Sequence, residues 1–146
     1  MLRGNSIAKV DEKGRLKLPA QFRAAIEPEY GTEFFVTSLR GESVRIYPMR
    51  VWARVEEKLA RASSVDPAVM RFKNSVNFHG QCAVMDGQGR VLIHPLLREK
   101  AGIRGEVAVL GQQEFLEVWN RSAFEERLAG DPLTDADLAT LASLGI

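Results

Sequence analysis

Residue types that build most catalytic sites are scarce in this chain. Its 146 residues include one cysteine, Cys82, and two histidines, His79 and His94. A single cysteine excludes an internal disulfide, which fits a reducing compartment. The sequence also contains no Gly-rich phosphate loop, no serine-nucleophile motif and no carboxylate pair at helical spacing within an expected helix. We therefore expect a protein that is not an enzyme and that carries no cofactor.

The two histidines and the cysteine leave one chemical alternative open. Two residues separate His79 from Cys82, and His94 is expected one strand away, so the three side chains could form a metal site or a Cys–His pair. With so few candidate ligands, we prefer a partly buried thiol and two histidines without special chemistry, and we expect no metal.

Long hydrophobic runs are missing as well. No segment approaches the roughly 18 apolar residues of a membrane span, and the start Met1–Ser6 lacks the apolar stretch of a signal peptide. With 45% hydrophobic and 27% charged residues, the composition is typical of a folded chain and excludes a disordered one. We expect a soluble, cytoplasmic protein with no membrane partner.

The most informative feature present is an internal repeat with a shift of 75 positions. Residues 11–23 align with residues 86–98 without a gap, and the segments that follow are also similar. Units of about 70 residues bury little surface alone, so we expect the two copies to pack intimately or to form oligomers. The aligned pairs of the motif are Asp11 with Asp86, Gly14 with Gly89, Arg15 with Arg90 and Arg23 with Arg98.

The repeated motif predicts a turn followed by a strand and a short helix. Asp at the first position and Gly at the fourth suit a type I turn, so Asp11–Gly14 and Asp86–Gly89 should each join two strands. Arg15–Leu18 alternates polar and apolar residues, as a half-buried strand does. A helix should begin at Pro19 and end near Glu27–Pro28, because the residue before proline avoids helical geometry.

The rest of each copy is predicted to contain two more strands and a closing helix. In the second copy, the short helix should begin at Pro95 and end at Gly102, with Ile103 folding back. The second closing helix begins with Ser122 and Glu125 at capping-box spacing. One face of the first closing helix carries Val51, Val55, Leu59 and Ala62. The predicted strands span 34–38, 43–47, 106–111 and 115–119.

Two further helices are predicted outside the copies. Asp66-Pro67 should begin a helix that links them, and Thr134 with Asp137 should cap a short tail helix, either docked or frayed. The expected divisions are a first unit over 1–65, a linker helix over 66–79, a second unit over 80–130 and a tail over 131–146.

The motif residues resemble those of the MraZ family, and the resemblance covers roughly residues 1–128. That resemblance implies two tandem SpoVT/AbrB-like units of the swapped-hairpin type, packed as a pseudo-dimer in a mainly β fold with short helices (α+β). His94 departs from the family pattern, where two consecutive prolines are frequent, and the tail beyond about residue 130 carries no matching motif. The resembling segments are Arg3-Gly4-Asn5, Asp11–Arg15 with its Leu-Pro and Phe-Arg continuation, Tyr47-Pro48 with Trp52, and Gly89-Arg90 with Leu97-Arg98.

The resemblance also implies a function. A member of this family would be a DNA-binding transcriptional regulator, associated with the nucleoid. It would act at the promoter of the division and cell-wall gene cluster, which includes its own gene. Ring-shaped homo-oligomers that bind short, G-rich direct repeats of double-stranded DNA are expected from the same resemblance.

Charge distribution indicates which copy would contact DNA. Residues 1–73 carry 14 lysines and arginines against nine acidic residues, whereas residues 74–146 carry six against ten. We therefore expect the first copy to read DNA and the second to support assembly. Arg15 is the candidate for guanine contact, and Lys9, Lys13, Lys17 and Arg3 are candidates for phosphate contact. Three lysines are not repeated: Lys9 aligns with Val84, Lys13 with Gln88 and Lys17 with Leu92.

Structural roles are the alternative for the repeated residues. Asp11 with Arg15, and Asp86 with Arg90, could be ion pairs that close the turns around Gly14 and Gly89. Arg23 and Arg98 lie on the short helices, where structural pairing is favoured. Two other functions also remain open: a ring that binds only proteins, and an AbrB-like antitoxin whose tail after Asp131 binds a partner.

Overall fold

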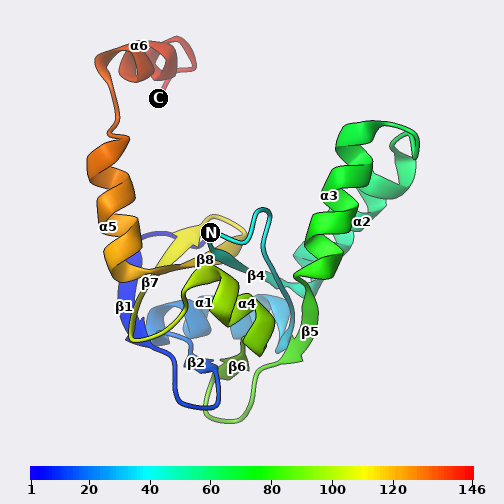
Figure 1. Ribbon diagram of the computed structural model, residues 1–146, viewed down its shortest axis with the longest axis vertical. Coiled ribbons are helices and arrows are strands. Elements are labelled where there is room, and N and C mark those ends of the chain that lie inside the picture. Colours follow the sequence, from blue (N-terminus) through cyan, green and yellow to red (C-terminus); the bar gives the residue numbers. More distant parts are fainter.

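The same order of elements occurs twice in the computed structural model, which describes residues 1–146 (Figure 1). Each run contains two strands, a helix, two further strands and a closing helix. The linker helix α3 (Pro67–Phe78) separates the runs, and α6 (Asp135–Ser143) follows the second. The first run is β1 (Asn5–Lys9), β2 (Arg15–Lys17), α1 (Ala20–Tyr30), β3 (Glu33–Thr37), β4 (Val44–Pro48) and α2 (Met49–Arg61). The second is β5 (Gln81–Val84), β6 (Arg90–Leu92), α4 (Pro95–Ala101), β7 (Glu106–Gln112), β8 (Phe115–Asn120) and α5 (Arg121–Gly130).

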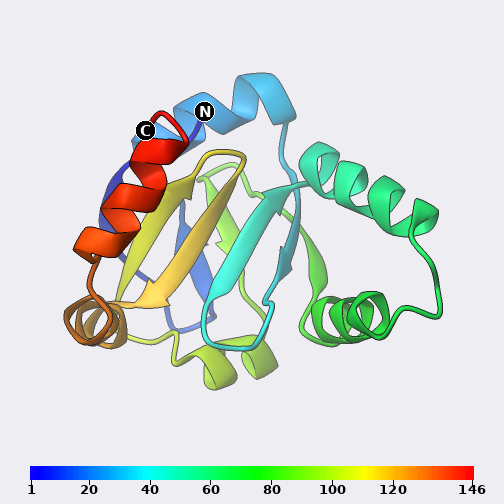
Figure 2. The same ribbon diagram turned by 90° about the horizontal axis from the view of Figure 1, so that it is seen from above.

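The two runs exchange their short strands. A six-stranded antiparallel sheet has the order β1-β7-β8-β4-β3-β5, so β1 pairs with the second run and β5 with the first. A separate two-stranded ribbon joins β2 to β6. Helices α1 and α4 flank the strands on opposite sides (Figure 2). This exchange confirms the expected α+β fold of two tandem swapped-hairpin units packed as a pseudo-dimer.

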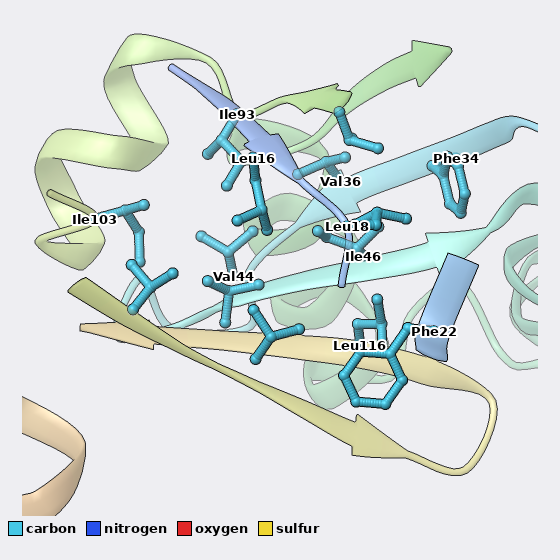
Figure 3. Close-up of a cluster of buried hydrophobic side chains, with 14 of the residues drawn as sticks. Leu16, Leu18, Phe22, Phe34, Val36, Val44, Ile46, Ile93, Ile103 and Leu116 are labelled. Atoms are coloured by element: carbon cyan, nitrogen blue, oxygen red, sulfur yellow. The ribbon is translucent and has the colours of Figure 1, made fainter. Parts of the chain in front are cut away.

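Both runs contribute to one hydrophobic core (Figure 3). Leu16, Leu18 and Phe22 belong to it, as do the matching Val91 and Ile93 of the second run, and none of them is more than 2% exposed. Full burial of each such side chain contributes roughly 1.5–3 kcal/mol. Because each run supplies half of the core, folding of one run depends on the other.

A second, smaller cluster anchors the arm formed by α2 and α3. Trp52 of α2 stacks on Phe35 of β3 with ring centroids 4.7 Å apart, and Val76 of α3 packs into the same cluster. Val51 of the predicted apolar face is buried and Val55 packs against the cluster, whereas Ala62 is exposed. Beyond this anchor, the helical arm projects away from the body (Figure 1).

Helix α1 continues past its predicted end. It includes Pro28 and ends at Tyr30, and Gly31 follows with a φ of 81°. Tyr30 packs against both hydrophobic clusters, and the Arg50 guanidinium lies 5.1 Å from the centre of its ring. These contacts favour the extra turn over the local preference of Glu27 for an extended conformation.

The N-terminal cap of α5 also differs from the prediction. Asn120 caps this helix, because its Oδ1 accepts a hydrogen bond of 3.0 Å from the Ala123 N–H, and Ser122 lies inside the helix. Strand β8 runs directly into α5, so the helix begins earlier than the capping-box spacing suggests. The Asn120 amide also donates to the Gly102 carbonyl at 2.9 Å, which joins this cap to the end of α4.

The other predicted helix ends are confirmed. Gly102 adopts a left-handed conformation after α4, and the N–H of the buried Ile103 donates to the Arg98 carbonyl at 2.9 Å. Asp66 caps α3, and Thr134 forms the capping box that begins α6. Helix α6 is formed but has no buried residue, so it is not docked on the body. None of the helices combines the length and apolar character needed to cross a membrane.

Candidate nucleic-acid interface

The ribbon of β2 and β6 has one buried face and one exposed face. Its residue pairs are Arg15 with Leu92, Leu16 with Val91, and Lys17 with Arg90. Leu16 and Val91 are completely buried in the core. Side chains alternate along a strand, and directly paired residues share a face. The outer surface, called the ribbon face below, therefore carries Arg15, Lys17, Arg90 and Leu92.

The Asp11 carboxylate organises the first turn. Its Oδ1 accepts hydrogen bonds from the Lys13 N–H at 3.0 Å and the Arg15 N–H at 2.9 Å. Its Oδ2 accepts from Arg15 Nε at 2.8 Å. The Gly14 N–H donates to the Asp11 carbonyl at 2.9 Å, and Gly14 has a φ of +83°, which favours glycine. The predicted turn is confirmed, and so is the ion pair named as a structural alternative.

The second turn reproduces this arrangement. Asp86 Oδ1 accepts from the N–H groups of Gln88 and Arg90 at 2.9 Å each, and its Oδ2 accepts from Arg90 Nε at 2.7 Å. Gly89 has a φ of +79°. The two turns lie side by side at one end of the molecule, below β2 and β6 in Figure 1. Arg15 and Arg90 are thus fixed in the same way on one surface.

Both aspartates are held in their charged form by these contacts. The Arg15 N–H contributes most to lowering the pKa of Asp11 below its usual 3.8. Burial opposes this shift, and the Arg15 guanidinium and the Lys13 N–H add to it. Hydrogen bonds from Arg90 and Gln88 lower the pKa of Asp86 in the same way. Each turn therefore favours the charged form of its carboxylate.

The ion pairs leave part of each guanidinium free. The Arg15 side chain donates to Asp11 only through Nε, and its two terminal nitrogens make no hydrogen bond within the protein. Arg90 is bound to Asp86 in the same manner. An arginine held at Nε has a fixed orientation while its terminal N–H groups remain available to a bidentate acceptor. A structural ion pair and contact with a ligand are compatible roles for the same side chain.

Arg23 and Arg98 brace the turns from behind, each reaching the turn of the other run. Arg98 donates to the Ile93 carbonyl at 2.8 Å and packs against Gly14, where an added Cβ would overlap its guanidinium. Arg23 Nη2 lies 3.3 Å from the Gly87 carbonyl, and an added Cβ at Gly89 would lie 2.9 Å from its Nη1. The sequence predicted structural roles for both arginines, but it did not indicate that they cross between runs.

The predicted phosphate contacts fall into two places. Lys9, Lys13 and Lys17 are exposed on β1, the first turn and β2, close to Arg15 in the chain. Arg3 is exposed before the opposite end of β1, about 20 Å from Lys9 at the usual rise per residue. The structure brings the three lysines to the same turn region and leaves Arg3 apart. Leu92, which the sequence did not single out, is the further member of the ribbon face.

The histidines and the cysteine do not form a common cluster. His94 Nε2 contacts the His79 backbone carbonyl at 2.8 Å, and His79 Nδ1 contacts the Ser75 carbonyl at 2.9 Å. Cys82 lies on the edge strand β5 and is exposed, so the expectation of a partly buried thiol is wrong. The alternation of this strand turns Ala83 towards the core and Cys82 away from it.

Two interleaved units with matched Asp–Arg turns define a tandem swapped-hairpin protein with a cationic β-ribbon. The family model described as "MraZ protein, putative antitoxin-like" matches residues 1–75 and 79–141, one match for each run. The second match extends into the tail, further than the motifs alone indicated. The chain belongs to the MraZ family.

Curated relatives match all or most of the chain. A protein of Acidobacterium capsulatum is 47% identical over 146 residues, and one of Koribacter versatilis is 46% identical over 147, with 100% of each chain covered. A protein of Escherichia coli is 33% identical over 132 residues, which cover 90% of this chain and 87% of the relative. All three carry the name Transcriptional regulator MraZ.

Proposed function

We propose that this protein is a transcriptional regulator that inserts the ribbon face into the major groove of DNA. The observation that carries the proposal is the fixed orientation of Arg15, bound through Nε to Asp11 with its terminal nitrogens free. Such a guanidinium can donate two hydrogen bonds to O6 and N7 of guanine. The major groove is wide enough for a two-stranded ribbon.

The neighbouring cations have a different role. Lys9, Lys13 and Lys17 surround the first turn, and none of them makes an ion pair within the protein. Flexible exposed ammonium groups neutralise phosphates and give affinity that falls with salt. Arg3 would add a phosphate contact outside the ribbon face. Arg90 lies on the same face as Arg15, so it is a second candidate for base contact.

The family name supports the regulatory part of the proposal, since the curated relatives are called transcriptional regulators. The target we propose is the promoter of the division and cell-wall gene cluster, including the gene of this protein. The sites would be short, G-rich direct repeats. Action on DNA would place the protein in the cytoplasm at the nucleoid.

Exposed apolar residues on two projecting arms, the α2–α3 arm and helix α5, support a ring oligomer. Met70 and Phe78 of the α2–α3 arm are 51% and 68% exposed, and Leu128 of α5 is 57% exposed. Both arms project away from the end that carries the turns (Figure 1). Contacts between subunits through the arms would therefore leave every ribbon face open. Several identical ribbons on one ring would bind neighbouring repeats with multiplied affinity.

Footprinting of the region upstream of the gene, together with the mass of the oligomer in solution, tests the proposal. Protection should cover several adjacent repeats, and a duplex with three repeats should bind far more tightly than a duplex with one. Equal affinity for one and three repeats would contradict the multivalent assembly. Absence of any protected segment would refute the regulatory role at this promoter.

A further inference from the structure

Leu92 is an apolar side chain in the middle of a cationic surface. It is 49% exposed, although the core is already closed on the other side of the ribbon by Leu16 and Val91. Its three neighbours on the ribbon face are Arg15, Lys17 and Arg90. Core packing therefore does not require a leucine at this position.

The repeat shows that the position tolerates a charge. Lys17 occupies the matching position of the first run and is exposed on the same face. A lysine at residue 92 would fit the backbone and would increase the positive charge offered to phosphates. The second run nevertheless places an apolar group directly opposite Arg15. An apolar group at this point is suited to an apolar feature of the ligand.

Resting on the proposed function, we infer that Leu92 contacts the C5-methyl group of a thymine beside the guanine bound by Arg15. The thymine methyl is the apolar group that the major groove displays, and apolar side chains contact it there. Directly paired residues have Cβ atoms roughly 5 Å apart. That spacing is comparable with the rise of about 3.4 Å between successive base pairs. Arg15 and Leu92 can thus contact adjacent base pairs at the same time.

The probe for this contact is a duplex enriched by the wild-type protein from a random pool. Each thymine of the enriched site is replaced by deoxyuridine, which removes the methyl group and keeps the base pairing. At one thymine position, replacement in a single repeat should lower wild-type affinity about fourfold, the ratio that corresponds to burial of one CH2-sized group. Leu92→Ala should bind the thymine and deoxyuridine duplexes equally well.

Leu96→Ala is the matched control. Leu96 lies four residues further along the same run and is 47% exposed, but it belongs to α4 rather than the ribbon. This variant should keep the fourfold preference for thymine. The mass of each variant oligomer is measured alongside, because a smaller assembly in Leu92→Ala would show that Leu92 contacts another subunit.

The outcomes separate this inference from the proposed function. If the wild-type protein enriches no sequence, the proposed function fails. If it enriches a site but tolerates deoxyuridine at every thymine, or if the site has no thymine, the inference about Leu92 is wrong and the proposed function stands. Retention of the thymine preference by Leu92→Ala, or a change in its oligomer mass, would also overturn the inference.

Discussion

The Asp11–Gly14 and Asp86–Gly89 turns have the same backbone conformation but expose different side chains. In each turn, one carboxylate accepts from two N–H groups and one Nε, with all distances between 2.7 and 3.0 Å. The groups that hold the turn are therefore repeated. The exposed lysines are not repeated, since Lys13 corresponds to Gln88 and Lys17 to Leu92. The residues that hold the turn occur twice, whereas the exposed lysines, our candidates for phosphate contact, occur once.

Among these variants, Arg15→Ala should have the largest effect on specific DNA binding. Arg15→Ala would remove the proposed bidentate interaction with guanine, worth about 1–3 kcal/mol for each repeat bound, so specific binding in a gel-shift assay should disappear. The oligomer mass should stay unchanged, because Arg15 makes no contact outside its own turn except the ribbon pairing. Arg61→Ala, on the distant arm, is the control. Full retention of binding by Arg15→Ala would refute the assignment.

Arg90→Ala tests whether the second turn also contacts bases. A loss of specific binding as large as that of Arg15→Ala would show that both turns read bases. A small loss would show that the second turn mainly supports the fold.

Glycine substitutions test how Arg98 and Arg23 pack against the turns. Gly14→Ala should lower the free energy of unfolding by about 2 kcal/mol or more, because a positive φ costs roughly 1–2 kcal/mol for an L-residue and the new methyl also overlaps the Arg98 guanidinium. Gly89→Ala should cost less, since its methyl meets the movable end of Arg23. Gly87→Ala has open space and is the control in a urea titration. Equal costs at all three positions would contradict the bracing role.

Charge exchange between the turns should change the salt dependence of binding. Lys13→Gln makes the first turn resemble the second, and the slope of log K against log salt should decrease by about 0.9 for each phosphate that the variant no longer neutralises. Gln88→Lys makes the reverse change and should increase the slope by a similar amount if the second turn also lies against the duplex. An unchanged slope in Lys13→Gln would exclude a phosphate contact by this lysine.

The smallest effect is expected in the titration of the turn carboxylates. In Arg15→Ala, the pKa of Asp11 should rise towards 3.8 but stay below it, because the N–H groups of residues 13 and 15 still donate. The pKa of Asp86 should not change and serves as the internal control in an NMR titration. Because the pKa of Asp11 is lower in the folded state, its carboxylate stabilises the fold at pH values above the ordinary pKa of 3.8. That stabilisation is lost as the pH falls below 3.8 through the folded-state pKa.

Local chemistry explains which parts of the fold could be predicted. The carboxylate and the glycine of each turn act within four residues, and alternation in Arg15–Leu18 correctly marks the buried face. The partner of β2 could not be predicted from the same residues, because alternation identifies an apolar face and not the strand beside it. The end of α1 was wrong for a similar reason, since contacts of Tyr30 with distant residues outweigh the local effect of Pro28.

In the candidate site too, the residues that are close in sequence could be predicted, and those brought together by strand pairing could not. Arg15 and its three lysines lie within nine residues of one another, so their proximity follows from one turn. Leu92 joins them only through the pairing of β2 with β6, which connects residues more than 70 positions apart. The crossing of Arg23 and Arg98 between runs depends on the same pairing. Local sequence therefore identified the cations, and tertiary pairing added the apolar member.

Fusion of the two units into one chain has a consequence for orientation. A dimer of identical chains would present its ribbon with two-fold symmetry, and such proteins read palindromes. Here Arg15 is paired with Leu92 at one end of the ribbon, and Lys17 is paired with Arg90 at the other. The two ends of the ribbon therefore differ. A duplex docked on it as proposed would have one preferred direction. If the proposed assembly holds, neighbouring ribbons that all point the same way along DNA would select sites repeated head to tail.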